Sequence, residues 1–447
     1  MKKNYKRLIL SLLAVLSLSA NASTVSLKTS KAVGEEITIA VNAVTNVTLT
    51  WGNGTVVTFA SDGAPVKVTV ADQSLVITTD NDLTALFLNE DGLTELTMTD
   101  AATLQRLFCA GNELKTLNLS ACTSLKELDC QDNQLTSLTL ANTLIEDINV
   151  AGNNLTSMGL KSSYVKNIRS IVCASNKLAS VSYLTSMANL RSLFCQDNSI
   201  TNLAVSSCVN LRSLIAANNN LKTFNGKQLK AIKNLWINDN QLDSVNLSAA
   251  TILTSLVVKN NNMSLIVWNK SCSSTLSYAD LSENQLFFNS FPTAYSSAQS
   301  AYRFPITLLP QRDYKLCDYA VTDTDYEAWR TVFYRNGFNT GPTATLTITD
   351  KYGYTLQKNT DFTYSSARLK FLTPHELVLI SAKSTYYPDV TLNVAPFPVH
   401  TADGIELVSS DKIGANEIYT LSGVRVNNTD RLPKGIYIIN GKKTVVK

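Results

Sequence analysis

The chain has 447 residues, of which 17% are charged, and its 39 basic and 35 acidic side chains leave a formal net charge of +4 at pH 7. This length exceeds that of one usual domain, so several modules are expected. So small a basic excess does not provide the surface that nucleic-acid binding or charge-driven membrane binding requires, and we expect no nucleic-acid partner.

Residues 1–22 have the organisation of a cleavable signal peptide. Four basic residues precede the apolar run LILSLLAVLSLSA, and Ala20-Asn21-Ala22 offers a small-x-small cleavage site. The run is shorter than the roughly 20 apolar residues that a transmembrane helix needs. We therefore expect an exported chain that starts near Ser23, has no transmembrane anchor and carries a formal net charge of about 0.

Residues 23–80 are predicted to form a β-module. Apolar and polar residues alternate in EITIAVNAV, NVTLTWGNGTVVTF, PVKVTV and SLVITT, and turn signals lie at residues 52–54 and 62–65. Such alternation between turns indicates strands and hairpins.

One 11-residue pattern, Leu-x-x-Leu-x-Leu-x-x-Asn-x-Leu, occurs ten times between Leu83 and Leu286 with apolar substitutes, and its copies are 20 to 23 residues apart. Period and pattern resemble the leucine-rich repeat. Positions four and six of a copy point the same way from a short strand, and a neighbouring copy must cover them. The resemblance implies a mainly β fold in which residues 81–288 form a ten-repeat solenoid with a parallel β-ladder.

Residues 23–80 directly precede the solenoid, and the first turn of a solenoid needs a capping structure that covers its apolar end. Their sequence Trp51-Gly52-Asn53-Gly54 resembles the W-G-D-G turn of β-modules that precede leucine-rich repeats in Bacteroidetes surface proteins, with Asn53 in place of the usual Asp. We therefore expect residues 23–80 to form an N-terminal β-cap.

The ninth position of the pattern is Asp91 in the first copy and Asn in the other nine. Its side chain lies where the chain leaves the strand, and an amide there can satisfy backbone groups that the turn leaves unpaired. We predict a structural ladder rather than a row of solvated loop residues. Its members are Asn112, Asn133, Asn153, Asn176, Asn198, Asn219, Asn240, Asn261 and Asn284.

Four of the eight cysteines, Cys109, Cys130, Cys173 and Cys195, fall in the sixth, inward-facing column. Cysteine behaves there as a small buried hydrophobe, and ligands stacked in one line cannot enclose a tetrahedral zinc ion. Rungs about 5 Å apart would permit disulfides within the pairs 109/130 and 173/195, so both states stay open, and we favour free thiols. No metal and no cofactor is expected.

The fifth column faces outward on the concave side, and seven of its ten residues are apolar. Position two adds Arg169, Arg191, Arg212 and Lys233 on four successive copies. An exposed apolar stripe edged with cations is typical of a binding surface; the alternative is a packed cross-strand ladder beside a solvated basic edge. The binding interpretation selects as partner-binding residues Phe87, Phe108, Phe194, Ile215, Trp236, Arg191 and Arg212.

Residues 289–342 are interpreted as an irregular linker that contains a short helix, DYEAWRTVFYRNGF, which Asp323-Thr324-Asp325 opens by capping its first turn. The acidic residues here lack the glycine and terminal glutamate of a calcium loop. Short alternating strands across residues 343–398 predict a β-sandwich module, immunoglobulin-like but without the Cys and Trp hallmarks.

Catalytic motifs are missing from the sequence. Its two histidines are His375 and His400, and the sequence HELVL lacks the second histidine of H-E-x-x-H. The sequence has no G-x-S-x-G and no phosphate loop. We expect a protein that is not an enzyme.

The sequence of residues 403–447 differs from that of the preceding module. Short predicted strands are separated by tight turns, and the last six residues are rich in lysine. The segments Ile418–Val424, Leu432–Ile439 and Lys442–Lys447 resemble the C-terminal sorting domain of the Bacteroidetes type IX secretion system, although this copy is short at its N-terminal side. The resemblance implies passage through that secretion machinery to the outer-membrane surface or the medium. The alternative is a small β-domain that closes the chain.

The sequence therefore predicts an exported, non-catalytic, adhesin-like leucine-rich repeat protein whose concave face binds a protein of a host or bacterial surface. A glycan-binding accessory and a structural surface-layer protein are the alternatives. A sugar site would favour Trp and Tyr beside Asp and Asn, whereas a protein site tolerates the Phe and Ile of this column.

Overall fold

The computed structural model describes residues 23–286 except 45, 80–82, 142–143, 161–164, 270 and 272–274, residues 344–399 except 366–367, 374 and 385–386, and short segments between 290 and 326 and between 406 and 446. The predicted signal peptide, residues 1–22, lies outside the described residues. The chain divides into two compact units, residues 1–258 with 269–276 and residues 259–268 with 277–447. Each unit is described by itself.

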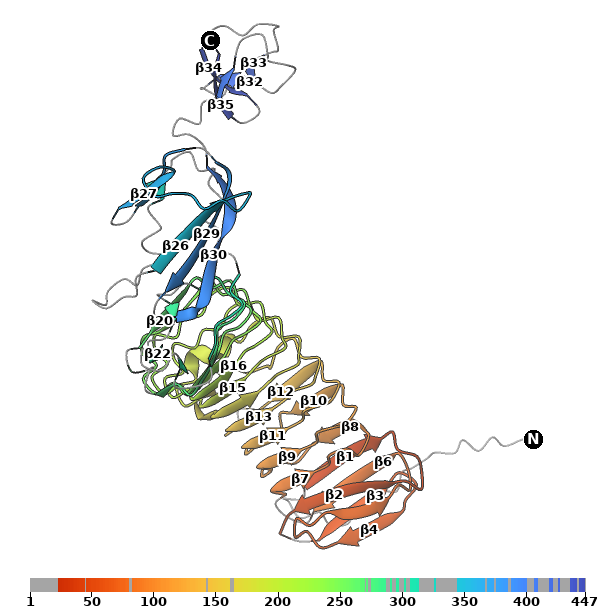
Figure 1. Ribbon diagram of the computed structural model, residues 1–447. Helices are drawn as coiled ribbons and strands as arrows, with labels where there is room; N and C mark the ends of the chain where they lie inside the picture. The colour runs from red at the N-terminus through yellow and green to blue at the C-terminus, as the bar shows by residue number, and fades with distance from the viewer. Residues whose placement is uncertain are drawn as a thin grey trace, which may run out of the picture. The chain divides into compact units, whose positions relative to one another are not determined.

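The first unit is built on short parallel strands that follow one another along a sheet (Figure 1). The central residue of every strand is a buried leucine or isoleucine, and neighbouring strands pair residue for residue. Nine such strands are β7 (Ala85–Phe87), β9 (Arg106–Phe108), β11 (Glu127–Asp129), β13 (Asp147–Asn149), β14 (Ser170–Val172), β15 (Ser192–Phe194), β16 (Ser213–Ile215), β17 (Asn234–Trp236) and β19 (Ser255–Val257).

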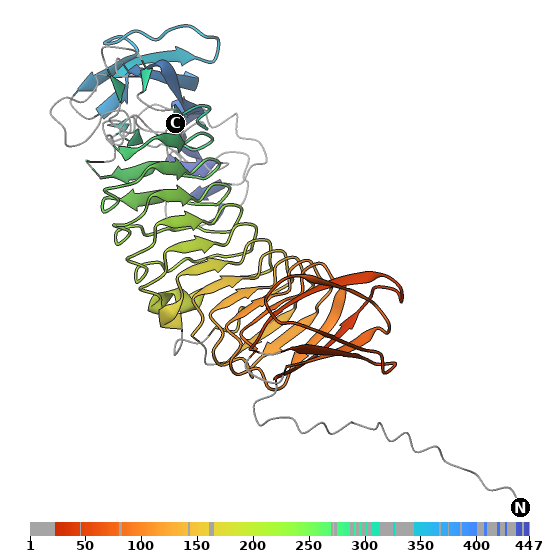
Figure 2. The same ribbon diagram turned by 90° about the horizontal axis from the view of Figure 1, so that it is seen from below.

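The opposite side of the unit is less regular. Its first part is a second sheet in which β10 (Thr116–Leu119) pairs in parallel with β12 (Ser137–Leu140) and with β8 (Leu93–Met98). Two short 3-10 helices, η1 (Val165–Asn167) and η2 (Ser182–Ser186), and strand β18 (Ser244–Leu247) follow. Figure 2 shows successive turns of this coil from another side. The predicted fold class is confirmed, because the unit is a leucine-rich repeat solenoid.

Columns four and six of the repeat fill the core between the two sides. Cys109, Cys130, Cys173 and Cys195 are fully buried there and, like the other two described cysteines, are free thiols. Burial raises the pKa of Cys109 and of Cys173 to about 12, so these thiols stay protonated at neutral pH. Cys272 and Cys317 lie outside the described residues.

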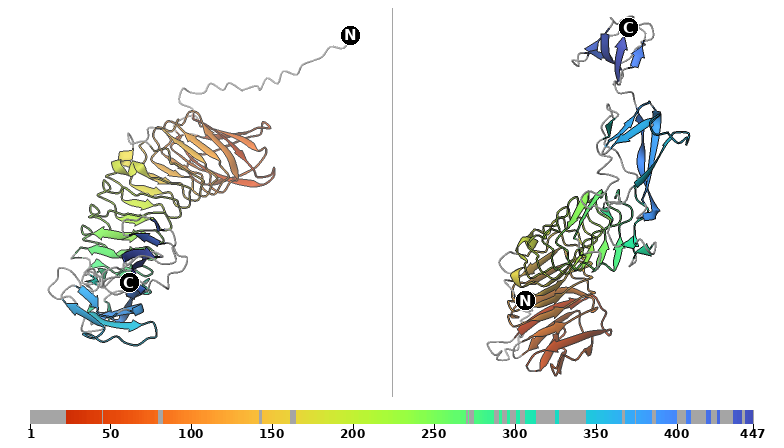
Figure 3. Two further views of the ribbon diagram at one scale, coloured as in Figure 1. Left: turned by 90° about the horizontal axis from the view of Figure 1, so that it is seen from above. Right: turned by 60° about the vertical axis from the view of Figure 1, so that its left-hand side comes forward.

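The N-terminal cap extends both sheets of the solenoid. Strand β1 pairs antiparallel with β8, and β2 pairs antiparallel with β7, so the cap covers both edges of the first turn (Figure 3). Trp51, beside the predicted turn, is buried in the core of the cap. The six cap strands are β1 (Ser23–Thr29), β2 (Glu36–Asn42), β3 (Val47–Trp51), β4 (Val56–Phe59), β5 (Val66–Thr69) and β6 (Ser74–Thr79).

The second unit begins with repeat-like structure that the sequence analysis places partly in a linker. Strand β24 (Ile306–Thr307) pairs in parallel with β21 (Tyr278–Asp280). The Gln311 amide accepts the Leu286 N–H at 2.9 Å and donates to the Leu281 carbonyl at 2.9 Å, which is the bonding expected of a ninth-position side chain. The interpretation of residues 289–342 as an irregular linker with one short helix is therefore wrong at residues 306–312. The unit also contains β20 (Leu265–Trp268), β22 (Tyr295–Ser296) and β23 (Ala301–Tyr302).

The predicted sandwich region forms two three-stranded sheets. One has the order β26 (Ala344–Asp350), β29 (His375–Ser384), β30 (Tyr387–Val399), and the other has the order β25 (Asp325–Tyr326), β28 (Arg368–Phe371), β27 (Phe362–Ser365). The helix predicted to begin at Asp325 does not begin there, because Asp325 and Tyr326 pair with Lys370 and Leu369 as a strand. The rest of that predicted helix, and His400, lie outside the described residues.

The C-terminal region forms one sheet of short strands. Its order is β31 (Glu406–Val408), β35 (Lys442–Val446), β34 (Gly435–Ile439), β32 (Ile418–Thr420), β33 (Arg425–Val426). Residues 421–424, 432–434 and 447 of the sorting-type segments lie outside the described residues.

Candidate functional site

The ninth-column amides fix the turns that follow the concave strands. The Asn133 Oδ1 accepts the Leu114 N–H at 3.0 Å, and its Nδ2 donates to the Cys109 carbonyl at 2.9 Å and to the Cys130 carbonyl at 3.2 Å. The same bonds recur at Asn153 and Asn176. Each amide thus ties its own strand to the preceding one, which holds the outward-facing side chains in register.

The eighth column shows a second regularity that the sequence analysis missed. Asp132, Ser175, Asp197, Asn218 and Asp239 have φ between 51° and 57°, in the left-handed region that most residues avoid. Gly111 and Gly152 occupy the same column with φ of 66° and 63°. The recurrence of Gly, Asp and Asn before the ninth position is the sequence signal for this tight turn.

The predicted partner-binding residues do not form one continuous cluster. Phe87 and Phe108 stack on each other, with ring centroids 4.9 Å apart and planes at 7°. Asp129 and Asn149 occupy the same column on the next two strands, so polar side chains separate this pair from the apolar residues that follow.

The second apolar group lies farther along the solenoid. Phe194 pairs in register with Ile215, and Ile215 pairs with Trp236. Phe194 and Ile215 are half-buried, whereas 40% of the Trp236 surface is exposed. The Trp236 Nε1–H donates to the Ser255 Oγ at 2.9 Å, which holds the indole ring over the sheet. These side chains present a continuous, partly exposed apolar surface.

Arg191 and Arg212 lie just before strands β15 and β16, three residues ahead of the fifth column, and both are exposed. They line a hollow of about 260 Å³ at the edge where the chain enters the strands. Three asparagines that the sequence analysis did not single out, Asn167, Asn189 and Asn210, line it too. Their signal in the sequence is an asparagine immediately before the repeat in three successive copies.

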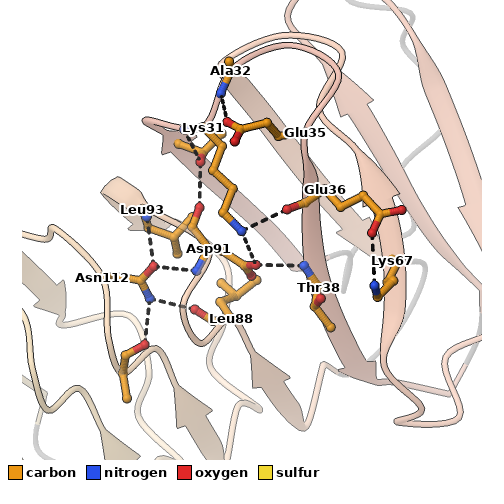
Figure 4. A network of polar contacts seen from close by, with 12 residues as sticks. Lys31, Ala32, Glu35, Glu36, Thr38, Lys67, Leu88, Asp91, Leu93 and Asn112 are labelled. Atoms are coloured by element: carbon orange, nitrogen blue, oxygen red, sulfur yellow. Dashed lines mark hydrogen bonds and ion pairs between the residues drawn. The ribbon is translucent and has the colours of Figure 1, made fainter.

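Asp91 joins the cap to the first turn (Figure 4). It is 1% exposed; its Oδ1 accepts the Thr38 N–H at 2.8 Å and lies 3.9 Å from the Lys31 Nζ. Its Oδ2 has no hydrogen-bond partner. Burial raises the pKa of Asp91 to about 6, against the lowering effects of the Thr38 hydrogen bond and of Lys31.

Within the described part of the chain, no group of three or more His, Cys, Asp or Glu side chains is placed to hold a metal ion. No helix among these residues has the length and apolar character needed to cross a membrane.

No protein-family model and no curated protein matches this chain. Solved structures with leucine-rich repeats do match. A leucine-rich repeat protein of Leptospira interrogans is 21% identical over 48% of this chain and 63% of its own, with a TM-score of 0.37. YopM, a leucine-rich effector protein of Yersinia pestis, is 22% identical over 49% of this chain and 58% of its own, with a TM-score of 0.38.

The functional domain of InlJ from Listeria monocytogenes, which includes a cysteine ladder, is 16% identical over 74% of this chain and 94% of its own, with a TM-score of 0.36. The chain spans less than two thirds of the Leptospira and Yersinia proteins. What this chain shares with these solved structures is the fold of the repeats.

Proposed function

We propose that this chain is an exported, non-catalytic repeat protein that binds a protein of a host or bacterial surface, in the manner of an adhesin, through its concave face. The supporting observation is the fifth column on five consecutive strands, β14 to β19. Its residues there are all apolar and only partly buried, and they lie in register: Val172, Phe194, Ile215, Trp236 and Val257.

A stripe of this kind spans about 19 Å, because strands of a sheet are about 4.8 Å apart. Contiguous exposed apolar surface favours association with a partner that covers it. Aromatic side chains near the centre of such a surface commonly contribute most of the binding free energy. Phe194 and Trp236 are therefore the residues on which we expect binding to depend.

Export belongs to the same proposal. The signal-peptide pattern of residues 1–22 would direct the chain out of the cytoplasm. The C-terminal β-domain, residues 403–447, would act as the type IX sorting domain that its sequence resembles. An exposed binding face is useful to a surface protein only if the chain reaches the surface.

The test compares wild type with Phe194→Ala and Trp236→Ala for binding to a panel of purified extracellular-matrix proteins and to a glycan array. We expect each substitution to weaken binding of a captured matrix protein by about tenfold or more, with little change in melting temperature. Val56→Ala, which removes an exposed apolar side chain from cap strand β4, is the control and should bind like wild type.

Two outcomes would contradict the proposal. Lower melting temperatures with unchanged affinity would mean that the column is a packed ladder. Capture of glycans alone, lost in Trp236→Ala, would replace protein binding by the glycan-binding alternative.

A further inference from the structure

A polar groove runs beside the concave stripe, and we call it the arginine groove. Its walls are the position-two arginines of three successive copies, Arg169, Arg191 and Arg212, and the asparagines two residues before each of them. Glu146 lies at one end. The groove encloses about 260 Å³, which is room for several side-chain carboxylates but not for a folded domain.

The backbone fixes the spacing of these cations. The Arg191 N–H donates to the Arg169 carbonyl, the Arg212 N–H to the Arg191 carbonyl and the Lys233 N–H to the Arg212 carbonyl, each at 2.8 Å. The side chains therefore leave the sheet at intervals of about 4.8 Å.

The asparagines hold the adjoining turns. The Asn189 Nδ2 donates to the Lys166 carbonyl and the Asn210 Nδ2 to the Ala188 carbonyl, both at 2.9 Å. Each amide thus ties its own turn to the preceding one. The groove is formed by hydrogen-bonded backbone rather than by free loops, so a ligand would find it already in place.

The charges of the groove are only partly balanced. Arg169 pairs with Glu146 at 2.8 Å, whereas no ion pair among the described residues involves Arg191, Arg212 or Lys233. Like charges on adjacent strands repel each other, so this row lowers the stability of the fold. A ligand that brings negative charge would relieve the repulsion.

We propose that the arginine groove binds carboxylate side chains of an acidic segment in the protein partner, an inference that rests on the function proposed above. A guanidinium group matches a carboxylate with two parallel hydrogen bonds. Arg191 and Arg212 lie on the same copies as Phe194 and Ile215, three residues or roughly 10 Å away along the strand. One partner segment can therefore place acidic side chains in the groove and apolar ones on the stripe.

Neighbouring charges place the acidic residues of the bound segment within the groove. Glu146 closes the groove on the side of β13, and Lys126, at position two of the copy beyond it, does not line the groove. The Glu146 carboxylate repels an acidic ligand, so the ligand's charges gather at Arg191, Arg212 and Lys233. A sulfated glycan would satisfy the cations but would bring no apolar groups to the neighbouring stripe, and for this reason we favour a protein.

The test measures binding of a fluorescent hexaglutamate peptide to the full chain by anisotropy at low and at physiological ionic strength. The double variant Arg191→Gln/Arg212→Gln should bind it roughly tenfold more weakly and with less dependence on salt. Lys177→Gln/Lys222→Gln removes the same charge from exposed residues outside the groove and should behave like wild type. Glu146→Gln, which frees Arg169, should bind the peptide more tightly.

Three results would separate this inference from the proposed function. Unchanged peptide affinity in the arginine variant would show a solvated edge and overturn the inference, while Trp236-dependent capture of a matrix protein would still support the function. Binding of a heparin oligosaccharide but not of hexaglutamate, lost in the arginine variant, would overturn the choice of a peptide. Arginine-dependent hexaglutamate binding without any captured matrix protein would support the groove and overturn the proposed function.

Discussion

At the scale of single residues, Asp91 differs most from the other members of its column. The remaining described positions hold neutral amides. At Asn112, for example, both ends are hydrogen-bonded: its Oδ1 accepts the N–H groups of Asp91 and Leu93, and its Nδ2 donates to the Leu88 carbonyl. Asp91 instead places a carboxylate with one unpaired oxygen between the cap and the first turn. Its ionised form is therefore poorly accommodated in the folded chain.

This environment predicts a pH dependence of stability. The pKa of Asp91 is raised to about 6 in the folded chain from an ordinary value of 3.8, so the folded state binds the proton more tightly than the unfolded state. The resulting stabilisation is complete below pH 3.8 and is lost as the pH rises through about 6. Asp91→Asn removes the buried charge and should raise the free energy of unfolding at neutral pH by about 2 kcal/mol, which is below the roughly 3 kcal/mol of the full pKa difference because solvent screens part of the effect.

Urea unfolding of wild type and Asp91→Asn, followed by tryptophan fluorescence, measures this difference, which should shrink from pH 7.5 to pH 4.5. Asp72→Asn is the control in the same module. Hydrogen bonds from Ser74 lower the pKa of Asp72, so that residue titrates below this range and its substitution should have a constant effect. The prediction would be refuted if the free energy of unfolding had the same pH dependence in wild type and in Asp91→Asn.

The raised pKa of Asp91 could not be predicted from the identity of the residue alone. In the sequence, Asp91 is a near-isostere of asparagine in a column of asparagines, and its burial depends on Thr38 and Lys31 of the cap, more than fifty positions away along the chain. The concave residues were easier to predict, because the period of the repeat alone places Phe194, Ile215 and Trp236 on one side of successive strands.

At the scale of the structural element, the repeat predicted the strand ladder because each copy carries the same buried columns. The turn at residues 306–312 escaped prediction, since Gln311 stands where the pattern requires asparagine. The helix predicted at Asp325 failed for a related reason: local capping signals favour a helix, but pairing with Lys370 and Leu369 fixes Asp325 and Tyr326 as a strand.

The ladder of amides leads to a prediction about one turn. Asn176→Ala leaves the buried Leu155 N–H, bonded to the Asn176 Oδ1 at 2.9 Å, without a partner. It also removes one of two amide donors from the Val150 carbonyl, which keeps its bond from the Asn153 Nδ2 at 3.1 Å. The free energy of unfolding should fall by about 1–3 kcal/mol, because that is the cost of one buried polar group left unpaired. Chemical denaturation measures it. Asn220→Ala, at an exposed position in a nearby turn, should change stability by less than about 0.5 kcal/mol. Equal effects of the two substitutions would contradict a structural role for the ladder.

At the scale of the whole molecule, composition and pattern predicted the order of β-rich regions along the chain. They did not predict how the cap is joined to the solenoid. Alternating residues mark β1 and β2 as strands, but nothing local assigns β1 to the sheet of β8 and β2 to the sheet of β7. Strand pairing is decided by contacts distant in sequence.

The last prediction concerns the route of the chain out of the cytoplasm. If residues 1–22 are cleaved, mass spectrometry of the secreted or surface fraction should find a mature N-terminus near Ser23. If residues 403–447 sort the chain, deleting them should leave the protein in the periplasm, whereas deleting only the sandwich residues 343–398 should not. The truncated protein would accumulate in the periplasm because its signal peptide still directs export from the cytoplasm, whereas the later step across the outer membrane needs the sorting domain. A cytosolic chain that retains Met1 would refute export, and unchanged surface display after deletion of residues 403–447 would refute sorting by this domain.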